Sequence, residues 1–126
     1  MVCLGKLTTV TAADLMLRNP KTLTVEASVG EARELLADPK VQMVLLADGR
    51  AFRGAVTHIP ADASPRDRAV NYVDSDAEVI SPRVPEDEAF ERAAANPHRR
   101  VIVLDEDGNL LGLLCLNQSR TKFCSS

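Results

Sequence analysis

Apolar and polar positions along this chain follow the same pattern twice. Each copy begins with a short β-prone run, continues with apolar residues at helical spacing, and ends with two extended apolar runs that a turn signal separates. This order predicts strand, helix, strand and strand. The first copy places its strands at residues 22–25, 41–47 and 51–57, with the helix following a cap at Ser28. The second copy places its strands at residues 79–82, 100–104 and 109–116, with the helix starting at Pro85.

The two copies align at a nearly constant offset. Ala32 matches Ala89 at 57 positions (89 − 32), and Gly54 matches Gly112 at 58 (112 − 54). One residue is therefore inserted in the hairpin of the second copy. Because neither copy can cover its apolar strands alone, we expect the two to pack face to face about a pseudo-two-fold axis.

Capping and breaker residues set the predicted helix ends. Ser28 and Glu31 form a capping-box pattern at the first helix, and Pro85 opens the second. Asp38-Pro39 and Asn96-Pro97 then stop the two helices. A small helix is expected at 11–17 and a short helix or loop at 64–68.

Composition narrows the function classes. The apolar fraction is 45% and the aromatic fraction only 3%, so the core is expected to consist of Val, Leu, Ile and Ala. The net charge of −3 offers no basic face for a phosphate backbone, which argues against nucleic-acid binding. The sequence has no run of about 18 apolar residues and no secretory leader pattern, so we expect a cytoplasmic protein without a membrane span.

The three cysteines, Cys3, Cys115 and Cys124, show no metal-binding spacing with each other or with His58 and His98. We expect free thiols in a reducing compartment, with Cys115 a small buried residue and no bound metal. A thiol switch or metal site formed by these cysteines is the competing hypothesis. No phosphate loop, dinucleotide fingerprint or nucleophile elbow occurs, so no enzyme activity is expected.

The ordered motifs of both copies resemble a known family. The first copy carries Asn19-Pro20, Val44-Leu-Leu-Ala-Asp-Gly49 and Gly54-Ala-Val-Thr57, and the second carries Val101-Ile-Val-Leu-Asp105 and Gly112-Leu-Leu. Together, over residues 11–118, they resemble a tandem cystathionine-β-synthase (CBS) domain pair, also called a Bateman module. The resemblance implies an α+β fold of two β-α-β-β-α repeats. Its boundaries would be 11–62 for the first repeat, 63–77 for a linker, 78–120 for the second repeat and 121–126 for a tail.

The resemblance also implies a function, namely non-catalytic regulation by an adenosine-containing ligand such as AMP, ATP or S-adenosylmethionine, held in two related clefts. No resident cofactor is implied beyond that regulatory ligand. The partners implied are a second copy of the chain, as a homodimer, and an unidentified regulated protein. The implied contacts are backbone near the adenine (Thr22, Leu23, Val79, Ile80), the strand end beside the ribose (Gly54, Ala55, Val56, Thr57, Gln118) and the phosphate contacts (His98, Arg99, Arg100).

The sequence departs from the family pattern at the ribose-binding strand ends. Pro60 stands where the family's Gly-x-x-Thr/Ser-x-x-Asp motif has a carboxylate. In the second repeat, Cys115 replaces the hydroxyl and Gln118 replaces the carboxylate with an amide. These departures motivate an alternative function, a ligand-free module for dimerisation or partner docking whose clefts have degenerated.

Overall fold

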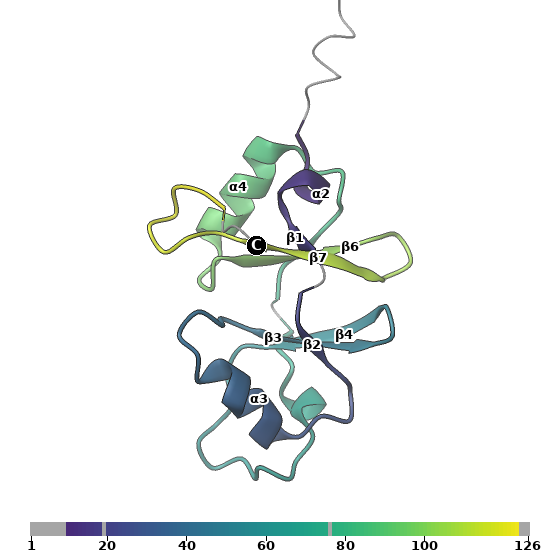
Figure 1. The fold of residues 1–126 in the computed structure, drawn as a ribbon, viewed down its shortest axis with the longest axis vertical. Coiled ribbons are helices and arrows are strands. Elements are labelled where there is room, and N and C mark those ends of the chain that lie inside the picture. The colour runs from purple at the N-terminus through teal and green to yellow at the C-terminus, as the bar shows by residue number, and fades with distance from the viewer. Residues whose placement is uncertain (1–9, 19, 76, 124–126) are drawn as a thin grey trace, which may run out of the picture.

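The computed structural model describes residues 10–18, 20–75 and 77–123. Two β-sheets lie face to face at the centre, and helices cover their outer faces (Figure 1). One sheet has three strands in the order β2-β3-β4, formed by β2 (Thr22–Leu23), β3 (Val44–Asp48) and β4 (Ala51–Val56). The other has four strands in the order β1-β7-β6-β5, formed by β1 (Leu17–Arg18), β5 (Val79–Ile80), β6 (Arg100–Leu104) and β7 (Leu110–Cys115).

Each repeat is a parallel strand pair joined through a helix and followed by a hairpin. In the first repeat β2 and β3 are parallel and α3 (Val29–Leu36) connects them, whereas β3 and β4 are antiparallel. In the second, β5 and β6 are parallel and α4 (Glu86–Ala95) connects them, with β6 and β7 antiparallel. A parallel pair needs such a crossover, so the helix in each repeat follows from the strand order. The predicted duplication and fold class are confirmed.

The helix-end predictions agree with the structure. The side-chain oxygen of Ser28 accepts a hydrogen bond from the Glu31 amide at 3.2 Å. α4 begins directly after Pro85 and ends before Asn96. The region around 64–68 forms a loop, and the helical turn η1 (Ala69–Tyr72) follows it.

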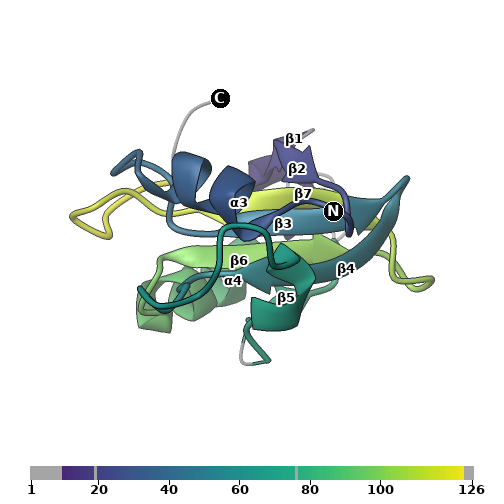
Figure 2. The same cartoon turned by 90° about the horizontal axis from the view of Figure 1, so that it is seen from below.

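The segment that precedes each repeat packs on the other repeat, which the sequence pattern did not indicate. Helix α2 (Ala12–Leu15) contacts β7 and α4 of the second repeat, and η1 contacts β4 of the first. The two preceding segments are themselves equivalent, because the offset of 57 pairs Ala12 of α2 with Ala69 of η1, and both residues are fully buried. Figure 2 shows the two sheets from below, with the linker crossing beside β4. This exchange ties the two repeats into one folded unit.

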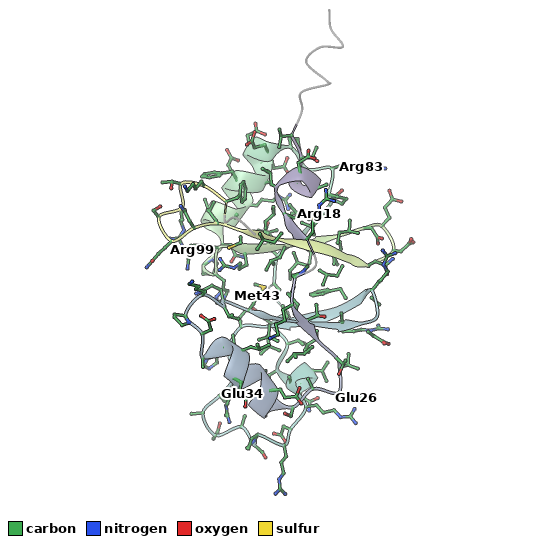
Figure 3. All side chains as sticks on the ribbon, viewed as in Figure 1. Arg18, Glu26, Glu34, Met43, Arg83 and Arg99 are labelled. Atoms are coloured by element: carbon green, nitrogen blue, oxygen red, sulfur yellow. The ribbon has the colours of Figure 1, made fainter. Side chains whose placement is uncertain are left out.

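The core consists of three clusters of small and branched aliphatic residues. One lies inside each repeat, and a third lies between the two sheets around Met43, Leu45, Ala55 and Ile102. Met43 projects between the sheets in Figure 3. The third cluster is the shared apolar face that the duplication predicts, and its burial favours the packed pair over separate repeats.

Within residues 10–18, 20–75 and 77–123, no helix is long and apolar enough to cross a membrane. In the same part of the chain, no group of three or more His, Cys, Asp or Glu side chains could hold a metal ion.

Cys115 is buried, as expected, but it is disulfide-bonded, so the expectation of a free thiol is wrong for this residue.

Candidate functional site

Two adjoining cavities open between the repeats on one side of the molecule. The first, of about 210 Å³, is mainly apolar and is lined by Leu17, Val41, Met43, Leu45 and Leu113 among others. The second, of about 520 Å³, is more polar and is lined by Arg99, Asn117 and Gln118 among others. Both are lined by Leu17, Lys40, Gln42, Arg100 and Cys115. We call the combined space the open cleft.

The sequence folds locally so that both repeats contribute to this cleft. Residues 39–43 follow α3 and precede β3, and the equivalent residues 96–100 follow α4 and lead into the first residue of β6. The offset of 57 pairs Met43 with Arg100 and Gln42 with Arg99. The open cleft therefore lies near the pseudo-two-fold axis, where the starts of the two central strands approach each other.

Arg99 lies on the tight turn after α4, and Arg100 is the first residue of β6. The amide of Arg99 donates to the Asn96 carbonyl at 3.0 Å, and Arg99 has a φ of 57°, a left-handed conformation that is uncommon for a residue other than glycine. The Arg99 guanidinium donates to the Leu116 carbonyl at 3.3 Å. Its place beside the second repeat is visible in Figure 3. Strained backbone of this kind is concentrated at functional sites.

Arg100 is buried at the base of the cleft and links the two repeats. Its residue is only 8% exposed, and its Nη2 donates to the Lys40 carbonyl of the first repeat at 3.0 Å. Its Nη1 donates to the Arg99 carbonyl at 3.1 Å and more weakly to that of Leu116 at 3.4 Å. Burial, followed by repulsion from Arg99, lowers the pKa of Arg100 below its ordinary value. The guanidinium remains charged at neutral pH because arginine does not deprotonate in proteins.

The predicted site residues divide among different places. Arg99, Arg100 and Gln118 share the second cavity of the open cleft. Thr22 lines a separate cavity beside Gly49 and Arg50, and Val79 and Ile80 line another beside the second hairpin turn. His98 is half-buried, and its amide donates to the Asn96 side chain at 2.8 Å. Leu23 packs on the core of the first repeat.

The remaining predicted residues lie on β4, which the linker covers, or directly after it. Ala55 and Val56 are fully buried, and Val73 packs over Gly54. The amide of Asp74 donates to the Ala55 carbonyl at 2.7 Å, and the Thr57 hydroxyl donates to the Asp74 carboxylate at 3.2 Å. Thr57 thus meets a carboxylate that comes from the linker, not from position 60.

Sequence reasoning missed several lining residues, namely Lys21, Lys40, Gln42, Met43 and Asn117. Two of these residues could have been predicted from the internal repeat. Applying the offset of 57 to Arg99 and Arg100 leads directly to Gln42 and Met43. Lys21 and Lys40 carry no such signal, since their approach to the cleft depends on how the two repeats pack.

The comparisons with known proteins agree with this geometry. Residues 12–59, which cover the first repeat, match the family model of the CBS domain. The CBS-pair domain of a putative Mg²⁺ transporter from Shewanella oneidensis MR-1 superimposes with a TM-score of 0.76 at 14% identity, covering 93% of this chain and 71% of that one. The fold is that of a CBS-domain pair.

Other CBS pairs are similar over most of their length. CBSX2 from Arabidopsis thaliana gives a TM-score of 0.71 at 21% identity, with 86% of this chain and 89% of that chain covered. A structure of CBSX2 in complex with AMP gives 0.68 at 21% identity, with 87% and 91% covered. No curated protein sequence matches this chain. At these identities, the CBS-pair similarity establishes the fold.

Proposed function

We propose that this CBS pair is a non-catalytic regulatory module that binds an adenosine-containing ligand, of the AMP, ATP or S-adenosylmethionine type, in the open cleft. The observation that carries the proposal is that a mainly apolar cavity adjoins a more polar one, with the cations Lys40 and Arg100 lining both. A ligand with a flat apolar base and a polar tail matches such a division. The solved complex of CBSX2 with AMP supports the ligand class.

In this proposal the base lies against Leu17, Met43 and Leu113, and the ribose lies near Asn117 and Gln118. An amide side chain can donate and accept hydrogen bonds with ribose hydroxyls, although it lacks the charge of a carboxylate. The tail extends toward Arg99 and Arg100. Binding would bridge residues from both repeats and thereby favour one packing of the pair over others.

Calorimetric titration of the full chain with AMP, ADP, ATP and S-adenosylmethionine tests the proposal. We expect saturable binding of at least one of them, together with a rise in melting temperature. NADH serves as a comparison ligand with a second nucleotide. Absence of binding by all of these compounds would remove the adenosine-ligand function.

The alternative function is ligand-free dimerisation or docking to a regulated partner. The observation that favours it is the closed state of the β4 strand end, where Thr57 is bonded to Asp74 and Val73 covers Gly54. We propose a homodimer in either case. A stable dimer in analytical ultracentrifugation, combined with a melting temperature that no ligand changes, would favour the alternative.

A further inference from the structure

Cys115 lies at the wall of the open cleft and forms a covalent bond that the proposed function does not use. It is the last residue of β7, it is buried, and it lines both cavities of the cleft. On the neighbouring strand it is paired with Arg100. Cys115 is disulfide-bonded. The bond therefore ties a second part of the chain to the wall of the cleft.

The second cysteine of this bond is one of two, because the chain's other cysteines are Cys3 and Cys124, which both lie outside the described residues. Backbone register favours Cys124. Leu116 and Phe123 form an antiparallel bridge directly after β7. In antiparallel pairing, each step back along one strand is a step forward along the other, so the next pair of positions is 115 and 124.

The path from Cys115 to Cys3 is longer. The carbonyl of Val10, the first described residue, accepts a hydrogen bond from the Glu86 amide at 2.9 Å, at the start of α4. Cys115 instead lies opposite the first residue of β6, the strand that follows the end of α4. A helix of 10 residues is about 15 Å long. A bond to Cys3 would require the residues before Val10 to run along that length.

The terminal segment, residues 117–123, begins with a turn that is largely exposed. The Asn117 side chain accepts a hydrogen bond from the Thr121 amide at 2.9 Å and donates one to the Thr121 hydroxyl at 3.1 Å. Residues 118–122 are exposed. A segment with few buried contacts opens locally at little cost in free energy. A disulfide between positions 115 and 124 would restrict that opening, because it would join the two ends of the segment.

The terminal segment also contacts helix α4 at two points. The Nε of Arg120 donates to the Ala94 carbonyl at 3.1 Å. The ring of Phe123 packs edge-on against that of Phe90, with ring centroids 5.8 Å apart. Arg120 is itself exposed, and both phenylalanines are only half-buried. These contacts place the segment on α4 without burying it deeply.

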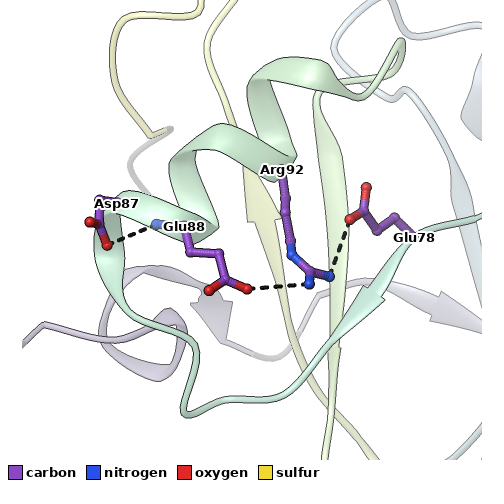
Figure 4. A network of polar contacts seen from close by, with 4 residues as sticks. All are labelled: Glu78, Asp87, Glu88 and Arg92. Carbon is purple, nitrogen blue, oxygen red and sulfur yellow. Dashed lines mark hydrogen bonds and ion pairs between the residues drawn. The ribbon is translucent and has the colours of Figure 1, made fainter.

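Helix α4 is held in place by contacts that do not involve the terminal segment. Arg92 forms ion pairs with Glu78 at 3.4 Å and with Glu88 at 3.2 Å (Figure 4). Ala89 and Ala93 of the same helix are fully buried in the core of the second repeat. Opening of the terminal segment would therefore leave α4 in position. The change would be confined to the segment and to the cleft wall that it helps to form.

We propose that Cys115 and Cys124 form a reversible disulfide, a thiol–disulfide switch that sets whether the terminal segment is fixed at the wall of the open cleft or opens locally. Asn117 and Gln118 of this segment line the second cavity, so the oxidation state changes the order of that wall. The inference does not depend on the ligand of the proposed function.

The exchange partner is a thiol of the glutathione class. Its thiolate attacks one sulfur, forms a mixed disulfide and releases the other sulfur as a thiolate, and a second glutathione then displaces the remaining protein thiolate. Two glutathione thiols become one glutathione disulfide, and the protein gains two thiols. Cys115 is buried, so this exchange follows local opening of the exposed segment.

Peptide mapping identifies the cysteine bonded to Cys115. The full chain is purified without reductant, its thiols are blocked with N-ethylmaleimide, and it is digested with trypsin. Cleavage after Lys and Arg places the three cysteines in separate peptides, residues 1–6, 101–120 and 123–126. We expect the mass of 101–120 joined to 123–126, which reduction separates. A link to 1–6, or no link to 101–120, would overturn the assignment.

Equilibration with glutathione buffers tests whether the bond is a switch. The fraction of blocked thiol is measured over the range of ratios found in reducing and oxidising compartments. We expect the disulfide to pass from mostly oxidised to mostly reduced within that range, and to re-form when the oxidised buffer is restored. A bond that stays oxidised throughout is a static cross-link, and one that stays reduced throughout does not serve any compartment. Either result would overturn the switch.

Amide hydrogen exchange of the oxidised and reduced full chain tests the structural effect. We expect the amides of the terminal segment to exchange about tenfold to a hundredfold faster after reduction, the range for losing a cross-link that closes about ten residues. The amides of Val101 to Val103 in β6 should not change. Equal exchange of the terminal segment in both states, or a comparable increase in β6, would contradict a switch confined to this segment.

Two variants separate the cysteines. Cys124→Ser should exchange like the reduced native chain whether or not reductant is present. Cys3→Ser is the matched control, because it also removes one cysteine but should respond to reductant as the native chain does. The native chain with reductant gives the same comparison if either variant fails to fold. A Cys3→Ser chain that has lost the response, beside a Cys124→Ser chain that keeps it, would reverse the assignment and overturn the proposal.

Discussion

Gly54 in β4 lies directly beneath the side chain of Val73. A Cβ placed on Gly54 would come within 2.6 Å of Val73 Cγ1, and the φ of Gly54 is +141°. Gly112, its equivalent in β7, is covered in the same way by Met16, whose Sδ would lie 2.5 Å from an added Cβ. Both copies therefore keep a glycine where the exchanged segment crosses the hairpin strand. The glycine is needed for the packing between repeats.

Gly54→Ala should destabilise the fold by about 2 kcal/mol or more, because it adds a clash to an unfavourable φ. Denaturant unfolding followed by circular dichroism measures the change. Gly49→Ala is the matched control, since Gly49 also has a positive φ, +61°, but open space around its Cβ position. We expect that control to lose only about 1 kcal/mol.

A second substitution distinguishes the clash from the backbone strain. Val73→Ala removes the nearest methyl carbons, so Gly54→Ala should cost less in the Val73→Ala background than in the native one. Equal costs in both backgrounds would contradict the contact described above and leave backbone strain as the cause.

Arg33 on α3 donates hydrogen bonds to the loop that follows β4. Its Nη2 donates to the Pro60 carbonyl at 2.7 Å and to the Ala63 carbonyl at 2.9 Å. Arg33→Ala should lower the free energy of unfolding by about 2 kcal/mol, because buried or half-buried carbonyls then lose a charged donor. Glu34→Ala, at an exposed neighbouring position on the same helix, should change it by less than about 0.5 kcal/mol. Similar losses in both variants would show that helix propensity, not the loop contact, is responsible.

Asp105 stabilises the second hairpin turn in its ionised form. Backbone hydrogen bonds from Asn109 and Asp107, at 2.9 Å each, are opposed by a smaller effect of burial, and they hold the pKa of Asp105 below its ordinary value of 3.8. A depressed carboxyl pKa contributes stability that is complete above the unfolded value. That contribution is lost as the pH falls through the lower folded value.

The Asp105→Asn variant should therefore be less stable than the native chain at neutral pH, and the difference should shrink as the pH falls below 3.8. Melting temperatures measured between neutral pH and pH about 2 test this dependence. Asp107→Asn serves as the control, since its side chain is exposed at the same turn. A difference that stays constant over the whole range would contradict a role for the ionised carboxylate.

The fold was predictable because its local signals repeat. Ser28, Pro85 and the two Asx-Pro stops fix the helices, and the offset between Ala32 and Ala89 fixes the duplication. The exchange of α2 and η1 between repeats was not predictable, since short helices of this length carry little periodic signal. The predicted strand at 41–47 begins later, at Val44, because residues 41–43 line the open cleft instead of pairing.

The site was predictable only in part. Arg99, Arg100 and Gln118 were named from the resemblance and do share one cavity. The Thr57 hydroxyl donates to the carboxylate of Asp74, a linker residue that is 17 residues away along the chain. The family motif has a fixed spacing, so it could indicate a carboxylate partner for Thr57 only at position 60. The approach of Asp74 to Thr57 depends on how the linker packs, and that is a tertiary property.

The charge difference between Lys21 and Glu78 predicts one nucleotide per chain. In the open cleft Lys21 lies among cations, whereas Glu78 and Asp74 occupy the equivalent places on the other side and would repel phosphates. Titration with ATP should therefore give one molecule bound per chain. Lys21→Gln should weaken that binding by up to about fivefold, the range of a solvent-exposed charge contact. Glu78→Gln should leave both the affinity and the stoichiometry unchanged, although it removes the pair with Arg92. Two molecules of similar affinity per chain would contradict the asymmetry, because the carboxylates would then be no barrier to a second nucleotide.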